Sequence, residues 1–167
     1  MAEPIKLDTM VSAHAIAHGS LVQFDICFNE TERRQLSERF AFIKLEEVMG
    51  KLALVQIADR CWELKGKINV AITQACVVSG QPVESTFMVE LEERFVDSFS
   101  DQTEIDAMEV DVDLLVNGEI PVGECLCQWI GVSAPAWPRA EHVPVLDGSK
   151  FDNTENHPFA RLSELKK

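Results

Sequence analysis

The sequence predicts an α+β fold: an antiparallel β-sheet (a meander or a partly open barrel) with a few flanking helices and an extended C-terminal tail. Three runs between Lys51 and Phe95 alternate apolar and polar residues, which is typical of strands with one buried face. An amphipathic run after Asn29 and an apolar run after Pro121 indicate a helix before and a helix after these strands.

The first predicted elements are a strand and a helix. The strand lies within residues 19–28, GSLVQFDICF, where apolar residues recur at nearly every second position. The helix follows in NETERRQLSERFAFIKL, residues 29–45. Asn29 is a good N-cap, and Glu32 stands three residues later, where a capping box requires it.

The central strands are expected to form a meander of hairpins. Asp59 and Arg60 separate the run KLALVQIA from CWELKGKINVAITQA, so an antiparallel hairpin is the economical connection. The residues SGQP, 79–82, form a turn signal, because glycine accepts unusual dihedral angles and proline has no amide for a ladder. The run STFMVELEERF then resumes the alternation.

The C-terminal half is less regular. Residues 98–108 are acidic and weakly apolar, which favours a loop, and a short strand or turn is expected near 110–112. The apolar segment 121–132 predicts a buried helix with Pro121 in its first position. We therefore expect a single α+β domain over 1–139, with an acidic loop at about 97–113, and a flexible tail over 140–167 that ends in a short helix.

Charge is distributed unevenly along the chain. The net charge is −13, and 12 of the 28 acidic residues lie between Glu84 and Glu119, whereas 8 of the 15 basic residues lie between Arg33 and Lys67. Such a net charge disfavours tight, nonspecific binding to nucleic acid unless a local basic face compensates. The basic residues of interest are Arg33, Arg34, Arg39, Lys65 and Lys67, and the arginine face of the helix is the best local candidate for contact with phosphate. The acidic residues of interest are Asp101, Glu104, Asp106, Glu109, Asp111 and Asp113.

Residues capable of catalysis or metal binding do not form a recognisable motif. The five cysteines are an odd number scattered through apolar segments, which favours reduced thiols. Cys125 and Cys127 lack the second close pair of a zinc site, and the acidic loop lacks the central glycine of a calcium loop. The position of Cys76 is compatible with a metal ligand, a nucleophile or a packed thiol, and we interpret it as a thiol packed at a strand end. We expect no cofactor, no metal and no enzymatic activity.

The chain resembles the YceD family of large-ribosomal-RNA-subunit accumulation proteins, in its alphaproteobacterial form. The resemblance covers about residues 24–167 and rests on the order of the helix NETERRQLSERFAFIKLEE, the strand and turn LKGKINVAITQACVVSGQPV, the acidic segment EIDAMEVDVDLLVNGEIPVGE, SAPAWPRAE and the closing HPFARLSELKK. The family landmarks are Cys76, Pro82, Val83, Pro135, Pro138 and Arg139. Many relatives carry Cys-x-x-Cys in the turn, whereas this chain has Cys76 and Ser79, so the resemblance implies no zinc ribbon here.

The resemblance implies a noncatalytic role in the accumulation, processing or assembly of the large-subunit (23S) ribosomal RNA. The expected partners are a large-subunit precursor, 23S RNA or a basic ribosomal protein, with no membrane and no small-molecule substrate. In this role the five basic residues named above are the candidate RNA contacts, and the six acidic residues are the candidate protein contacts. A first alternative is an acidic module that holds a basic ribosomal protein without touching RNA. A second is a thiol- or metal-dependent hydrolase. The N-terminus shows no apolar segment of a secretory signal, so a cytoplasmic location is expected.

Overall fold

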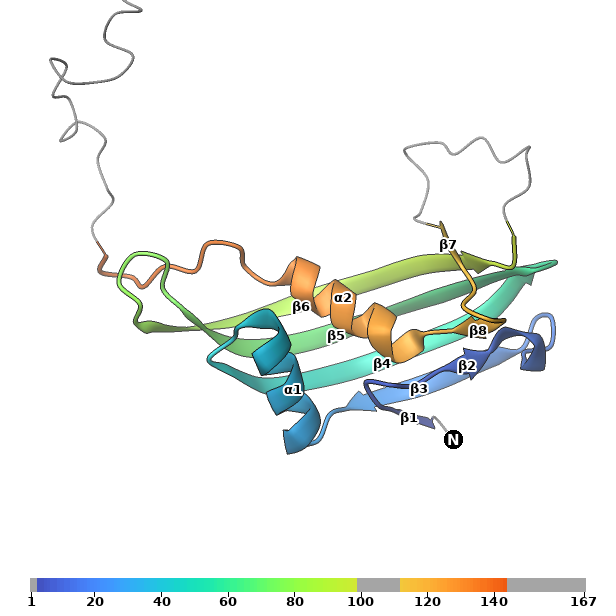
Figure 1. Ribbon diagram of the computed structural model, residues 1–167, viewed down its shortest axis with the longest axis horizontal. Coiled ribbons are helices and arrows are strands. Elements are labelled where there is room, and N and C mark those ends of the chain that lie inside the picture. Colours follow the sequence, from blue (N-terminus) through green and yellow to red (C-terminus); the bar gives the residue numbers. More distant parts are fainter. Residues whose placement is uncertain (1–2, 99–111, 144–167) are drawn as a thin grey trace, which may run out of the picture.

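The computed structural model describes residues 3–98 and 112–143, and it confirms the α+β class (Figure 1). A strongly curved sheet of long strands carries the two α-helices on one of its faces. The strands are β1 (Glu3–Ile5), β2 (Val11–Ser12), β3 (Leu21–Cys27), β4 (Lys44–Ala58), β5 (Cys61–Ala75), β6 (Pro82–Val96), β7 (Val112–Leu114) and β8 (Glu119–Ile120), and the helices are η1 (Ala13–Ala15), α1 (Glu30–Phe40) and α2 (Val122–Ser133).

The main sheet is open and has six strands in the order β1-β3-β4-β5-β6-β7. Strands β3 to β6 form the antiparallel meander that the alternating runs predict, and β1 and β7 add to it in parallel. The strands β2 and β8 form a separate short ladder. The partly open barrel is therefore not formed by the described residues, and the meander is confirmed.

Alternation along β5 separates two faces of the sheet. Leu64 and Ile68 are fully buried, whereas Lys65 and Lys67 lie between them in sequence and are exposed. Because successive side chains of a strand point to opposite faces, the lysines lie on the face opposite the core. We call the face that carries the lysines the open face, since no helix of residues 3–98 and 112–143 covers it.

Both α-helices pack on the other face, which we call the helix face. Leu36 of α1 and Leu126 of α2 belong to one buried cluster with the inward side chains of the strands. A Cβ atom on Gly131 of α2 would lie 2.5 Å from the ring of Phe40, which shows how closely the helices approach each other. A Cβ on Gly123 would lie 2.4 Å from two carbonyl oxygens of the N-terminal segment.

The helix boundaries differ from the sequence prediction at two places. The capping box of Asn29 and Glu32 is present, but α1 ends at Phe40, where Ala41 adopts a left-handed conformation with φ of 55°, and β4 begins at Lys44. Pro121 is the N-cap of α2 and not its first helical residue. The short elements β1, β2 and η1 were not predicted from sequence, because each is too short to show periodicity. No helix in the described part of the chain is long and apolar enough to cross a membrane.

Candidate functional site

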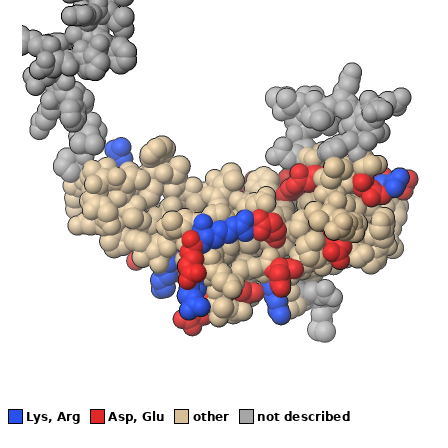
Figure 2. All heavy atoms as spheres, in the orientation of Figure 1, with Lys and Arg blue, Asp and Glu red and all other residues tan. Residues whose placement is uncertain are grey.

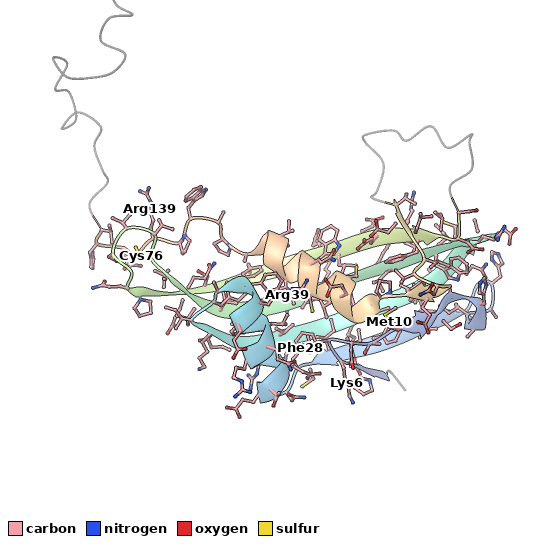
Figure 3. The ribbon with its side chains drawn as sticks, in the orientation of Figure 1. Lys6, Met10, Phe28, Arg39, Cys76 and Arg139 are labelled. Atoms are coloured by element: carbon pink, nitrogen blue, oxygen red, sulfur yellow. The ribbon has the colours of Figure 1, made fainter. Side chains whose placement is uncertain are left out.

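Arg39, one of the candidate RNA contacts, is held by a carboxylate of the neighbouring helix. Its Nη1 and Nη2 atoms donate to the two oxygens of Glu124 at 2.7 and 2.6 Å, between α1 and α2 (Figure 3). The hydrogen bond from Arg39 lowers the pKa of Glu124 to about 2, and the same bond raises the pKa of Arg39. A bidentate pair of this kind satisfies the guanidinium fork, so Arg39 is occupied as an interhelical tie.

The other two arginines of α1 differ in exposure. Arg33 donates through Nη1 to the main-chain carbonyl of Glu46 and is partly buried there. Arg34 lies 3.8 Å from Glu38, four residues along the helix, and both side chains are about three-quarters exposed. An exposed pair at this spacing is weak. Arg34 is therefore the α1 arginine that is most available to a ligand.

The two candidate lysines of β5 also have carboxylate partners. Lys65 lies 3.0 Å from Glu92 and 3.1 Å from Glu63, and Lys67 donates to Glu90 at 2.6 Å. The hydrogen bond to Glu92 is the main cause of the raised pKa of Lys65, and Lys67 lowers the pKa of Glu90. The cross-strand pairs with Glu92 and Glu90 place a carboxylate beside each ammonium group on the open face, and Glu63 of the same strand adds a second one beside Lys65.

The five candidate RNA contacts do not form one patch. The arginines belong to α1 on the helix face, and the lysines lie on the open face. Figure 2 shows basic and acidic atoms side by side on the helix face, without a broad continuous basic area. Sequence reasoning grouped these residues in one basic region because they are close along the chain. In the fold, the lysine side chains point to the face of the sheet opposite the one on which α1 packs.

Among the candidate protein contacts, Asp113 belongs to β7, while Asp101, Glu104, Asp106, Glu109 and Asp111 lie outside the described residues. Asp113 lines a cavity of about 360 Å³ together with Glu93 and Trp129. Glu93 is buried, and it accepts hydrogen bonds from Cys125 Sγ at 2.5 Å and from Trp129 Nε1 at 2.9 Å. Burial is the main cause that raises the pKa of Glu93. Sequence reasoning missed this carboxylate, although its signal was present: Glu93 occupies an apolar phase of the alternation in β6.

The cysteine pair of α2 belongs to the core. Cys125 and Cys127 are both buried, and burial raises the pKa of each thiol, that of Cys127 to about 11. Thiols that hold their protons so firmly are poor nucleophiles and poor metal ligands. Within residues 3–98 and 112–143, no group of three His, Cys, Asp or Glu side chains is placed to hold a metal ion.

Cys76 lies in the turn between β5 and β6, at the end of the sheet opposite to β7. Its buried sulfur accepts the amide hydrogens of Ser79 at 3.4 Å and Ala140 at 3.5 Å. Hydrogen bonding, chiefly from the side chain of Ser79, lowers the pKa of Cys76 to about 6. The thiol therefore both packs and anchors the chain that leaves α2.

The turn and the exit segment meet at one end of the molecule, where Figure 3 shows Cys76 near Arg139. The amide of Val77 donates to the Pro138 carbonyl at 3.0 Å, and Gln74 donates to the Pro135 carbonyl at 3.2 Å. Pro82, Val83 and Arg139 line a neighbouring cavity of about 840 Å³ together with eight other residues. Segments more than fifty residues apart in sequence thus form one structural unit.

The comparisons with known proteins found no protein-family model, no curated protein and no solved structure that matches this chain.

Proposed function

We propose that this protein is a noncatalytic factor in the accumulation of the large-subunit (23S) ribosomal RNA, and that it acts by binding a basic protein of the precursor particle. The process comes from the resemblance to the YceD family. The mode of action comes from the electrostatics of the chain, whose net charge is −13. An acidic surface attracts a basic protein and repels RNA phosphates.

The proposed mode of action rests on one observation: three of the candidate RNA contacts are paired with carboxylates. Arg39, Lys65 and Lys67 each face a carboxylate of this chain within 3.1 Å. A phosphate that approached them would have to displace these carboxylates or sit beside their charge. Side chains that are already paired neutralise few phosphates, so they would release few of the counterions condensed on the RNA, and that release is a large source of affinity for nucleic acid.

A second observation supports the resemblance itself. Cys76 in the turn and Pro138 in the exit segment come from separate landmark segments, and hydrogen bonds join these segments directly. Landmarks with one shared structural role are expected to occur together in a family. These contacts therefore support the use of the landmarks as a signature.

The test is a binding experiment with purified components. The tagged protein is presented separately with large-subunit ribosomal proteins freed of RNA and with protein-free 23S RNA, at low and at moderate salt. We expect retention of one or a few basic ribosomal proteins, and weak RNA binding that salt abolishes.

A matched pair of variants gives the control. Arg34→Glu removes the most available arginine of α1, and Glu84→Lys removes an exposed carboxylate that forms no ion pair within the described residues. The proposal expects Glu84→Lys to weaken protein binding and Arg34→Glu to leave it unchanged. Tight RNA binding that Arg34→Glu abolishes would refute the proposed mode and favour the RNA-binding alternative.

A further inference from the structure

One long edge of the main sheet has no partner strand in the described part of the chain. Strand β6 pairs with β5 along its whole length, from Pro82 to Val96. On its other side it pairs with β7 only at Arg94, Phe95 and Val96. The edge from Pro82 to Glu93 is therefore free among residues 3–98 and 112–143, and the parallel partner β7 begins where this edge stops.

The register shows which backbone groups point away from the sheet. The amide of Cys76 donates to the Gln81 carbonyl at 2.7 Å, so odd-numbered residues of β6 bond to β5. The amide of Leu115 donates to the Val96 carbonyl at 3.0 Å, so even-numbered residues face the outer side. Because the direction alternates along an antiparallel strand, the N–H and C=O groups of the even-numbered residues point outward. These residues are Glu84, Thr86, Met88, Glu90 and Glu92, and all five are exposed.

The chemistry beside this edge differs on the two faces of the sheet. The open face carries the carboxylates of Glu84, Glu90 and Glu92, and Glu84 has no ion pair within the described residues. The helix face carries the 360 Å³ cavity, which is lined in part by Trp129 and Val132. Val132 is 85% exposed. A strand beside β6 would place alternate side chains against these two surroundings.

We propose that the free edge of β6 binds an extended basic segment of a protein partner by strand addition. The segment alternates lysine or arginine, which lie beside the glutamates of the open face, with apolar residues, which lie on the helix face near Trp129. Main-chain hydrogen bonds to the even-numbered residues supply affinity, and the alternation supplies specificity. This inference rests on the proposed function, since it assigns the site at which the basic protein binds.

The test uses a synthetic peptide of about nine alternating lysine and valine residues, enough to span the edge from Glu84 to Glu92. A second peptide of the same sequence carries backbone N-methyl groups on the residues that would donate to β6. We expect the first peptide to bind and to slow hydrogen exchange at the amides of Thr86, Met88 and Glu90. We expect N-methylation to weaken binding by at least about tenfold, because it removes several hydrogen bonds at once.

A protein variant tests the same contact from the other side. Thr86→Pro removes one outward N–H and leaves the bonds to β5 in place, which an edge position tolerates. Thr86→Val keeps the amide and the branched shape, and is the matched control. We expect Thr86→Pro to weaken peptide binding severalfold and Thr86→Val to leave it unchanged, with the β5 amides equally protected in both.

The outcomes separate this inference from the proposed function. Equal binding of the methylated and unmethylated peptides to the wild-type protein would overturn strand addition, even if Thr86→Pro fails to fold. So would protection of the even-numbered amides before any peptide is added, since residues 99–111 or a second copy would then occupy the edge. Retention of a basic ribosomal protein equally by the wild type and by Thr86→Pro would overturn the edge site and leave the proposed function intact. Failure of the wild type to retain any basic protein would overturn the proposed function.

Discussion

Replacing Glu93 tests whether a charged carboxylate in the core destabilises the fold at neutral pH. Glu93 is 8% exposed, and burial raises its pKa, so the folded state holds the proton more tightly than the unfolded state does. The resulting stabilisation is full below the unfolded pKa of about 4.3 and is lost as the pH rises through the folded pKa. Glu93→Gln cannot ionise. Its stability relative to wild type should therefore increase between about pH 4.5 and pH 7.5.

The size of the effect follows from the two donors that Glu93 satisfies. Glu93→Gln retains a carbonyl oxygen for Trp129 Nε1, so we expect stability equal to or above that of wild type at neutral pH. Glu93→Leu leaves both Trp129 Nε1 and the Cys125 thiol without an acceptor, and we expect a loss of about 1–3 kcal/mol in the free energy of unfolding. The difference between the two variants isolates the hydrogen bonds from the charge.

Urea unfolding followed by circular dichroism, at about pH 5 and about pH 7.5, measures these differences. Glu92→Gln is the matched control, since Glu92 is the preceding residue and lies on the open face. Its loss should cost less than about 1 kcal/mol. If Glu93→Gln lost as much stability at neutral pH as Glu93→Leu, the ionised carboxylate would be required and the reasoning would be refuted.

Three further predictions concern other contacts. Gly123→Ala should lower the free energy of unfolding by about 1–3 kcal/mol in a urea titration, because the added methyl group would lie 2.4 Å from two backbone carbonyl oxygens and would force the backbone to shift. Ser79→Ala should raise the pKa of the Cys76 thiol from about 6, since the Ser79 side chain is the main cause that lowers this pKa. Thiolate absorbance followed against pH, with Cys76→Ala as the blank, measures the pKa. An unchanged midpoint would contradict the role of Ser79. Glu124→Gln should remove a small stabilisation that is present above about pH 4.3, the ordinary glutamate pKa, and that is lost as the pH falls through about 2. Because both partners are exposed by more than a third, the loss should not exceed about 1 kcal/mol. Thermal unfolding measures it, and Arg39→Ala should give a similar value.

The fold was predictable from the sequence where local patterns decide it. The alternation in β5 and β6 predicts their paired strands, and the capping box of Asn29 and Glu32 predicts the start of α1. The end of α1 was not predicted, because the residues after Phe40 read as a continuing apolar pattern. In the fold, Ala41 adopts a left-handed conformation that ends the helix, and β4 begins three residues later, paired with β5.

The candidate site was less predictable, because charge pairing is a property of the folded chain. Arg39 and Glu124 are 85 residues apart, and no local pattern connects them. The free edge of β6 was also hidden, since the sequence shows a strand but not how many neighbours it has. By contrast, Cys76 was interpreted as packing at a strand end, and its burial agrees with that interpretation.

The length of the central strands sets a minimum reach for any bivalent ligand. Strands β4, β5 and β6 each contain 15 residues, so each is about 50 Å long at about 3.3 Å per residue. The turn that anchors the exit segment through Cys76 lies at one end, and Val96 with β7 lies at the other (Figure 1). A ligand that engages both ends at once must therefore be an extended chain or a large particle, whereas a compact domain of ordinary size would touch one end and leave the other free.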